Sequence, residues 1–205
     1  MVSNEVRELA ISIVDDLFDK GFEQHFPHCF WNWADDLVEF GYWTNSGMTK
    51  VCIGREDLRG WVIKVALSGC EAYSANEYEV YCAAEEAGFS HYLPETIYLC
   101  ERAGNIFYLQ QEALCQEESI TSDWCERLRK TYEEKKLEYD EDDLYCDIDN
   151  LGDMERVMLS FNDWAFWDFL KQHHVNDLHE GNFGYIDGHL VIIDFSGYGW
   201  VREGE

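Results

Sequence analysis

Three polar side chains near the end of the chain place the strongest constraint on its fold. Asp177 and Asn182 lie five residues apart, and Asp194 directly follows the apolar run Leu190–Ile193. A turn that holds Asp177 and Asn182 can aim both side chains at one point. A buried strand over 190–193 can deliver Asp194 to the same point at its carboxyl end. Hard oxygen ligands of this kind suit Mg²⁺ bound together with nucleotide phosphates. The spacing therefore predicts a turn, a buried strand and a metal site.

Charge limits the partners that the chain can have. Its 205 residues suffice for one domain or two small lobes with a real core. They include 15 basic and 42 acidic side chains, which give a formal net charge of −27. Such a surface repels nucleic acid and anionic membranes and favours basic partners. Two interpretations stay open: a solvated acidic surface, and carboxylates that imitate phosphates to occupy a DNA-binding protein.

Cysteine usage and the chain's hydropathy bear on its location. The eight cysteines are scattered, with no C-x-x-C pair, which is typical of reduced thiols in a cytoplasmic protein. The first residues lack a basic start followed by an apolar segment, so no secretory signal is expected. No apolar stretch approaches the length needed to span a membrane. We therefore expect a cytoplasmic protein.

The first 114 residues are predicted to form a small α+β lobe. Helical spacing of apolar residues predicts a helix over 3–20. A second helix is predicted over 74–87, with Ser74 as N-cap and Glu77 as capping-box partner. Five antiparallel strands are predicted, at 38–40, 50–53, 61–66, 95–101 and 105–111.

The remaining residues, 115–205, are predicted to form a reduced, mainly helical lobe. An acidic insertion occupies about 115–155, and within it Glu138 to Asp143 has the composition of a loop. A long helix is predicted over 154–173. Two short strands, 183–185 and 190–193, flank a turn at Asp187-Gly188. The polar motifs lie within 177–197.

Five segments of the chain follow one another in a recognisable order. They are Trp61-Val62-Ile63-Lys64-Val65, Asn76-Glu77, Phe107 to Leu114, Asn176-Asp177-Leu178-His179-Glu180-Gly181-Asn182 and Asp194-Phe195-Ser196-Gly197. This order resembles that of the protein-kinase-like superfamily, including its aminoglycoside-phosphotransferase-like branch. The resemblance implies a bilobal fold with a five-stranded N-lobe, a truncated helical C-lobe, and ATP and Mg²⁺ as cofactors. The ending also resembles that of compact, phage-encoded kinase-like proteins.

The resemblance implies a nucleotide-binding role for five residues. Lys64 is expected to contact the α- and β-phosphates, with Glu77 orienting it. Gln111 is expected to occupy the gatekeeper position, and Glu112 and Leu114 are expected to offer backbone contacts to adenine. Helical periodicity independently favours Glu77 over Glu79 as the inward-facing glutamate. A capping role for Glu77 remains compatible with this.

The resemblance also implies roles for the three residues of the later motifs. Asp177 is expected to act as the catalytic base, while Asn182 and Asp194 bind the metal. His179 lies in the same loop, and we expect either a contact near the transferred phosphate or a solvent-exposed loop histidine. His25-Phe26-Pro27-His28-Cys29 contains metal-binding residue types but lacks a second ligand pair at usable spacing.

Several parts of the family pattern are absent from the sequence. Where a G-x-G-x-x-G loop is expected, the first hairpin has only Gly41 and Gly47. Val175-Asn176 replaces the usual His-Arg before the catalytic aspartate, and no activation segment follows Gly197. Protein phosphorylation is therefore less expected than nucleotide binding.

Two functions of different classes are consistent with the sequence. The first is an ATP- and Mg²⁺-dependent phosphotransferase with an unknown, cationic acceptor. The alternative is a catalytically degenerate, acidic kinase-like protein that binds a basic host protein, as an inhibitor or DNA mimic. The acidic segment Glu138 to Asp153 is expected to favour a positively charged partner in either case.

Overall fold

The computed structural model describes residues 2–19, 37–67, 69–102, 104–138 and 147–197. It divides into two compact units, the first holding 1–83 and 94–112 and the second holding 84–93 and 113–205. The fold class is α+β, with one five-stranded antiparallel sheet, a separate two-stranded sheet and helices. The histidine cluster at 25–29 and residues 139–143 of the acidic run lie outside the described residues.

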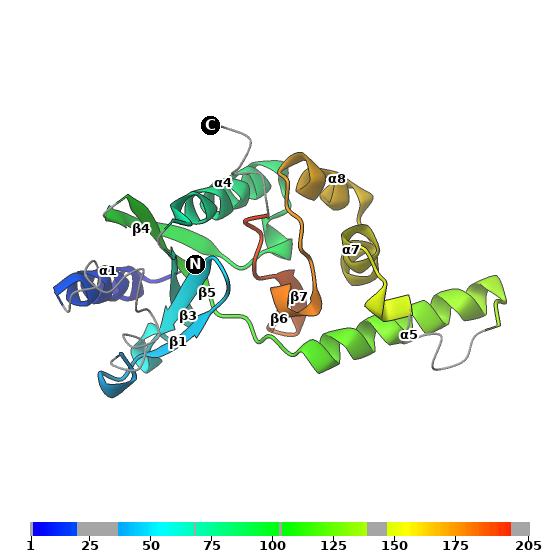
Figure 1. The fold of residues 1–205 in the computed structure, drawn as a ribbon, viewed down its shortest axis with the longest axis horizontal. Coiled ribbons are helices and arrows are strands. Elements are labelled where there is room, and N and C mark those ends of the chain that lie inside the picture. Colours follow the sequence, from blue (N-terminus) through cyan, green and yellow to red (C-terminus); the bar gives the residue numbers. More distant parts are fainter. Residues whose placement is uncertain (1, 20–36, 68, 103, 139–146, 198–205) are drawn as a thin grey trace. The chain divides into compact units, whose positions relative to one another are not determined.

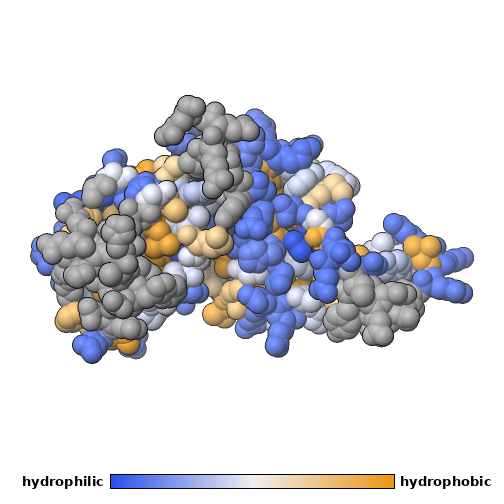
Figure 2. All heavy atoms as spheres, in the orientation of Figure 1, coloured by the Kyte–Doolittle hydropathy of each residue, from blue (hydrophilic) through white to orange (hydrophobic). Residues whose placement is uncertain are grey.

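The surface of the described residues agrees with the composition of the chain. Figure 2 shows hydrophilic residues over much of the face drawn, as expected for a net charge of −27. No helix in this part of the chain is long and apolar enough to cross a membrane. The six cysteines within it are free thiols.

The first unit is built on the five-stranded sheet (Figure 1). In spatial order its strands are β1 Trp43–Ser46, β2 Lys50–Gly54, β3 Trp61–Ala66, β5 Asn105–Gln111 and β4 Thr96–Arg102. Every neighbouring pair is antiparallel, so the predicted strand number and direction are confirmed.

The first strand lies later in the chain than predicted. Residues 38–40 do not form a strand: the backbone N–H groups of Phe40 and Tyr42 both donate to the carbonyl oxygen of Leu37 in a helical turn. Gly41, with φ of +82°, lets the chain leave that turn. The strand instead takes Trp43–Ser46, because a short hairpin loop before β2 requires its partner to end close to Ser46. The prediction at 38–40 followed β-propensity alone and is wrong.

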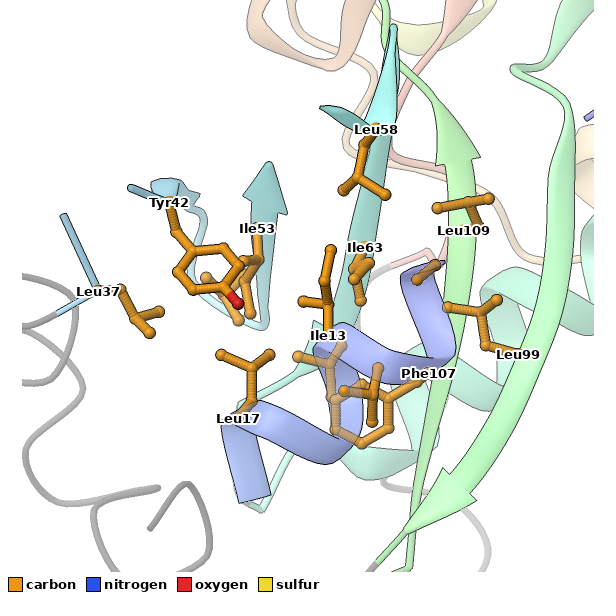
Figure 3. Close-up of a cluster of buried hydrophobic side chains, with 14 of the residues drawn as sticks. Ile13, Leu17, Leu37, Tyr42, Ile53, Leu58, Ile63, Leu99, Phe107 and Leu109 are labelled. Carbon is orange, nitrogen blue, oxygen red and sulfur yellow. The ribbon is translucent and has the colours of Figure 1, made fainter. Parts of the chain in front are cut away.

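One face of the sheet packs against α1, Asn4–Asp19, and so confirms the helix predicted over 3–20. The sheet contributes alternating apolar residues to this core, namely Val51, Ile53, Ile63, Val65, Phe107 and Leu109. Figure 3 shows Ile13 and Leu17 of α1 among the side chains of Ile53, Ile63 and Phe107. Because side chains alternate along a strand, the residues between these apolar ones face the other side.

The opposite face of the sheet carries polar side chains and faces α4, Glu71–Ala87. This helix begins at Glu71 rather than at Ser74, and the Glu71 carboxylate accepts from the Gly69 N–H at 2.9 Å. Ser74 and Glu77 therefore lie inside the helix, and the predicted capping box is wrong. The helix ends where predicted, at Gly88, whose φ of +83° suits a helix terminus.

The second unit combines helices with a small hairpin. Its elements are α5 Glu117–Lys135, α7 Asp153–Phe161, α8 Trp164–Gln172, the short 3₁₀ helix Glu180–Asn182, β6 Phe183–Ile186 and β7 His189–Ile192. The two strands pair antiparallel around Asp187-Gly188, which have φ values of 50° and 78°. This confirms the predicted hairpin and its turn.

The long helix predicted over 154–173 is in fact two helices. Asn162 adopts φ of 53°, which ends α7. The Asp163 carboxylate then caps α8 by accepting from Ala165 N at 2.9 Å and Phe166 N at 3.1 Å. Asn and Asp side chains compete with helical hydrogen bonds, so an Asn-Asp pair breaks a helix that the apolar periodicity alone would continue.

Candidate functional site

A buried ion pair joins the sheet to α4 in the first unit. Lys64 Nζ donates to Glu77 Oε1 at 2.6 Å, and the two side chains are 5% and 0% exposed. A buried charge without a partner costs several kcal/mol, on the order of the desolvation penalty of an ion, so each group needs the other. Glu79, the competing glutamate, is exposed. The inward orientation that periodicity predicted for Glu77 is confirmed, and its nucleotide-binding role stays a prediction.

A second lysine, which the sequence analysis missed, contacts the same glutamate. Lys50 Nζ lies 2.6 Å from Glu77 Oε2, and the Lys50 side chain is 3% exposed. This contact has the distance of an ion pair, but Oε2 makes no aligned hydrogen bond. The register places Cys52 opposite Lys64 and Lys50 opposite Ala66, so the two lysines are diagonal neighbours on one face. Two ammonium groups therefore share one carboxylate.

A glutamine on β5 completes the polar cluster. Gln110 Nε2 donates to Glu77 Oε1 and to Thr96 Oγ1, each at 3.2 Å. Gln111, which the resemblance placed nearby, pairs with Trp61 instead, and strand alternation directs its side chain to the face that carries α1. The structure thus brings Gln110, not Gln111, to the Lys64–Glu77 pair. The nucleotide-binding role of Gln111 stays a prediction.

The backbone after β5 is already engaged in hydrogen bonds at both predicted adenine contacts. Glu112 N donates to Gly60 O at 2.8 Å. Leu114 N donates to Tyr185 O at 3.0 Å, and Tyr185 N donates back to Leu114 O at 2.9 Å. An adenine contact through either N–H group would have to displace one of these bonds.

The predicted catalytic loop, in the second unit, is fixed by one aspartate. Asp153 Oδ2 accepts from Asp177 N at 3.1 Å, and Asp153 Oδ1 accepts from Leu178 N at 3.0 Å. Asp177 itself adopts φ of 66°, a conformation that a residue other than glycine rarely adopts without support. Its side chain is exposed. Asp153, at the first position of α7, therefore holds the proposed base in an otherwise unfavourable backbone conformation.

Asn182 and Asp194 come from adjoining ends of the hairpin. Asn182 Nδ2 donates to Asp177 O at 2.6 Å, which directs the amide oxygen away from Asp177. Ile193 N donates to Asn182 O at 2.8 Å, so the residue before Asp194 lies beside Asn182. Asp194 Oδ1 accepts from Ser196 Oγ at 3.0 Å. These hydrogen bonds place Asp177, Asn182 and Asp194 near one another in space within the second unit.

The two residues predicted to bind Mg²⁺ offer one amide oxygen and one carboxylate, and the metal site stays a prediction. Among the described residues no group of three or more His, Cys, Asp or Glu side chains is arranged to hold a metal ion. Mg²⁺ in nucleotide sites takes one or two protein oxygens and completes its shell with phosphate oxygens and water. One amide oxygen and one carboxylate, from Asn182 and Asp194, fit that requirement.

His179 has a structural role in the loop. Its Nδ1 accepts from Gly181 N at 3.1 Å, which caps the short helix Glu180–Asn182. A Cβ at Gly181 would lie 2.8 Å from His179 Cε1, so the imidazole ring would have to shift to make room for a larger residue. The hydrogen bond to Nδ1 therefore holds the imidazole ring of His179 in place.

The residues predicted to act on a nucleotide thus fall into two groups. Lys64 and Glu77 belong to the first unit, and Asp177, Asn182 and Asp194 to the second. Comparison of the chain with protein-family models, with curated proteins and with solved structures gives no match.

Proposed function

We propose that the protein is an ATP- and Mg²⁺-dependent phosphotransferase with a bilobal, kinase-like fold. The observation that carries the proposal is the buried Lys64–Glu77 pair, with its lysine on the third strand and its glutamate on the next helix. In protein kinases this pair must form for the lysine to hold the nucleotide phosphates. A cytoplasmic location is part of the proposal, which the free cysteines support.

Each residue of these two groups has a chemical task in this proposal. Lys64 neutralises charge on the phosphates, and Glu77 keeps its ammonium group in place. Asn182 and Asp194 hold Mg²⁺, which supplies further charge neutralisation when bound. Asp177 accepts the proton of the acceptor hydroxyl, with Asp153 fixing its backbone. The protein contributes mainly position and charge, as phosphoryl transfer requires.

Isothermal titration with ATP and Mg²⁺ tests the proposal directly. We expect saturable binding by the wild-type protein and a loss of about tenfold or more in affinity for Asp194→Ala and for Lys64→Met. Asp168→Asn, on the exposed side of α8, is the matched control and should bind like wild type. Absence of binding by the wild-type protein would refute the proposal. Unchanged affinity of Asp194→Ala would refute its metal role.

A second candidate, a binding protein without chemistry, is favoured by the acidic surface. The chain carries a net charge of −27, and α5 exposes Glu117, Glu118, Glu126, Glu133 and Glu134. Such a surface would attract a basic host protein. Affinity capture from a bacterial lysate at low and high ionic strength is the test, since an electrostatic partner should dissociate as salt rises. If Asp177→Asn abolished the biological effect without altering the fold, this candidate would fail.

A further inference from the structure

The connection between β1 and β2 is too short to wrap around phosphates. Only Gly47-Met48-Thr49 separate the strands. Their backbone is tied into the sheet at both ends, because Gly47 N donates to Lys50 O at 3.0 Å and Leu67 N donates to Thr49 O at 2.7 Å. A glycine-rich loop binds phosphates through several backbone N–H groups, and this turn lacks the length to supply them. A phosphate site here would need donors from side chains.

Lys50 is the first residue after this turn, and its side chain reaches the Lys64–Glu77 pair. Its strand position directs it to the same face as Lys64, and both ammonium groups lie 2.6 Å from Glu77 oxygens. Two lysines held on one carboxylate bring two positive charges to one small area of the sheet. A nucleotide's phosphates carry enough negative charge to interact with both.

The two lysines are not held equally by Glu77. Lys64 makes an aligned hydrogen bond to Oε1, and Gln110 donates to the same oxygen, which fixes it. Lys50 contacts Oε2 at ion-pair distance without that alignment. A lysine side chain is a flexible stem that carries three rotatable donors. Because the two lysines take different oxygens of Glu77, a phosphate contact made by Lys50 leaves the bond from Lys64 to Oε1 in place.

We propose that Lys50 is a second phosphate-binding residue, which contacts the nucleotide's phosphates together with Lys64 in place of a glycine-rich loop. This rests on the proposed nucleotide-binding function. It predicts that affinity depends on Lys50 only for ligands that carry phosphates, because the lysine acts on phosphate charge and not on the base.

Titration of ATP, ADP and adenosine with Mg²⁺ into wild type and Lys50→Met tests this. We expect ATP and ADP affinity to fall about tenfold or more in the variant, with adenosine affinity changed by less than about twofold. A purely structural role would lower all three affinities together. Lys171→Met, at an exposed lysine of α8, is the matched control. Wild-type ATP affinity retained in a folded Lys50→Met protein would overturn the proposal and leave the proposed function standing. Absence of nucleotide binding by wild type would instead refute that function.

A labelling experiment on the wild-type protein covers the case in which Lys50→Met does not fold. In an acyl-phosphate derivative of ATP, a nearby lysine amine attacks the acyl carbon, gives up a proton, forms an amide and releases ATP. We expect mass spectrometry to locate the acyl group on Lys50 as well as on Lys64, and excess ATP to suppress both. Acylation of Lys64 without Lys50, or of neither lysine, would overturn the proposal.

Discussion

Replacement of Glu77 by glutamine tests the buried cluster most directly. The substitution preserves the shape of the side chain but removes its charge, and it turns an –NH₂ group toward one of the two lysines. At 2.6 Å each lysine is attracted to the carboxylate by about 6 kcal/mol, for an effective dielectric constant of about 20. Desolvation of the ions offsets part of this, so loss of the partner should cost a net 3–5 kcal/mol, roughly the value for broken buried pairs.

Equilibrium unfolding in urea would measure this difference in the free energy of unfolding. Glu79→Gln is the matched control, because Glu79 lies on the same helix two residues later and is exposed. We expect the control to change stability by less than about 0.5 kcal/mol. If Glu77→Gln lay within about 1 kcal/mol of Glu79→Gln, the carboxylate would not be holding two buried charges, and the reasoning about Lys50 and Lys64 would be refuted.

Three other contacts make separate predictions. The backbone hydrogen bond from Phe166 lowers the pKa of Asp163 below its ordinary value of 3.8. The ionised cap therefore stabilises the fold above pH 3.8, and this stabilisation is lost as the pH falls further. Asp163→Ala should lower the free energy of unfolding in urea by about 1 kcal/mol at neutral pH and should remove this acid dependence. Burial and the hydrogen bond to Asp123 raise the pKa of Tyr185 from 10.0 to about 12. The stability that this bond contributes should be complete below pH 10 and should fall as the pH rises toward 12. In an alkaline absorbance titration, the transition of the tyrosine that ionises last should be absent from Tyr185→Phe. Asp153→Ala leaves the N–H groups of Asp177 and Leu178 without their acceptor, so their amide hydrogen exchange should accelerate while that of α5 stays unchanged.

Local patterns in the sequence predicted much of the fold because they act over short distances. The helix at α1 follows from apolar spacing along one segment, and the hairpin of β6 and β7 follows from the Asp187-Gly188 turn. The choice of Glu77 over Glu79 likewise needed only helical periodicity. The residues that determine each of these features lie close to one another in the chain.

Features that depend on pairing between distant residues were not accessible from the sequence. Lys50 joins the cluster only because the register of β2 against β3 places it diagonal to Lys64. A lysine at the start of an apolar strand was the available signal, since Lys50 and Cys52 alternate with Val51 and Ile53. The break at Asn162 was missed for another reason: apolar spacing continues across it, and the capping by Asp163 outweighs that spacing.

The position of Asp153 has a consequence for how the chain can vary in length. Asp153, which anchors the Asp177 loop, lies at the start of α7 and follows the acidic stretch. A hydrogen bond from Trp124 Nε1 to Ser160 Oγ at 2.9 Å joins α5 to α7. Both ends of the connection from α5 to α7 are thus fixed. Lengthening a connection between fixed ends costs little, about 0.6 kcal/mol for each doubling. Insertions into this connection should therefore be tolerated, whereas a single residue added between Asp153 and Val157 would move the anchor out of reach of the loop.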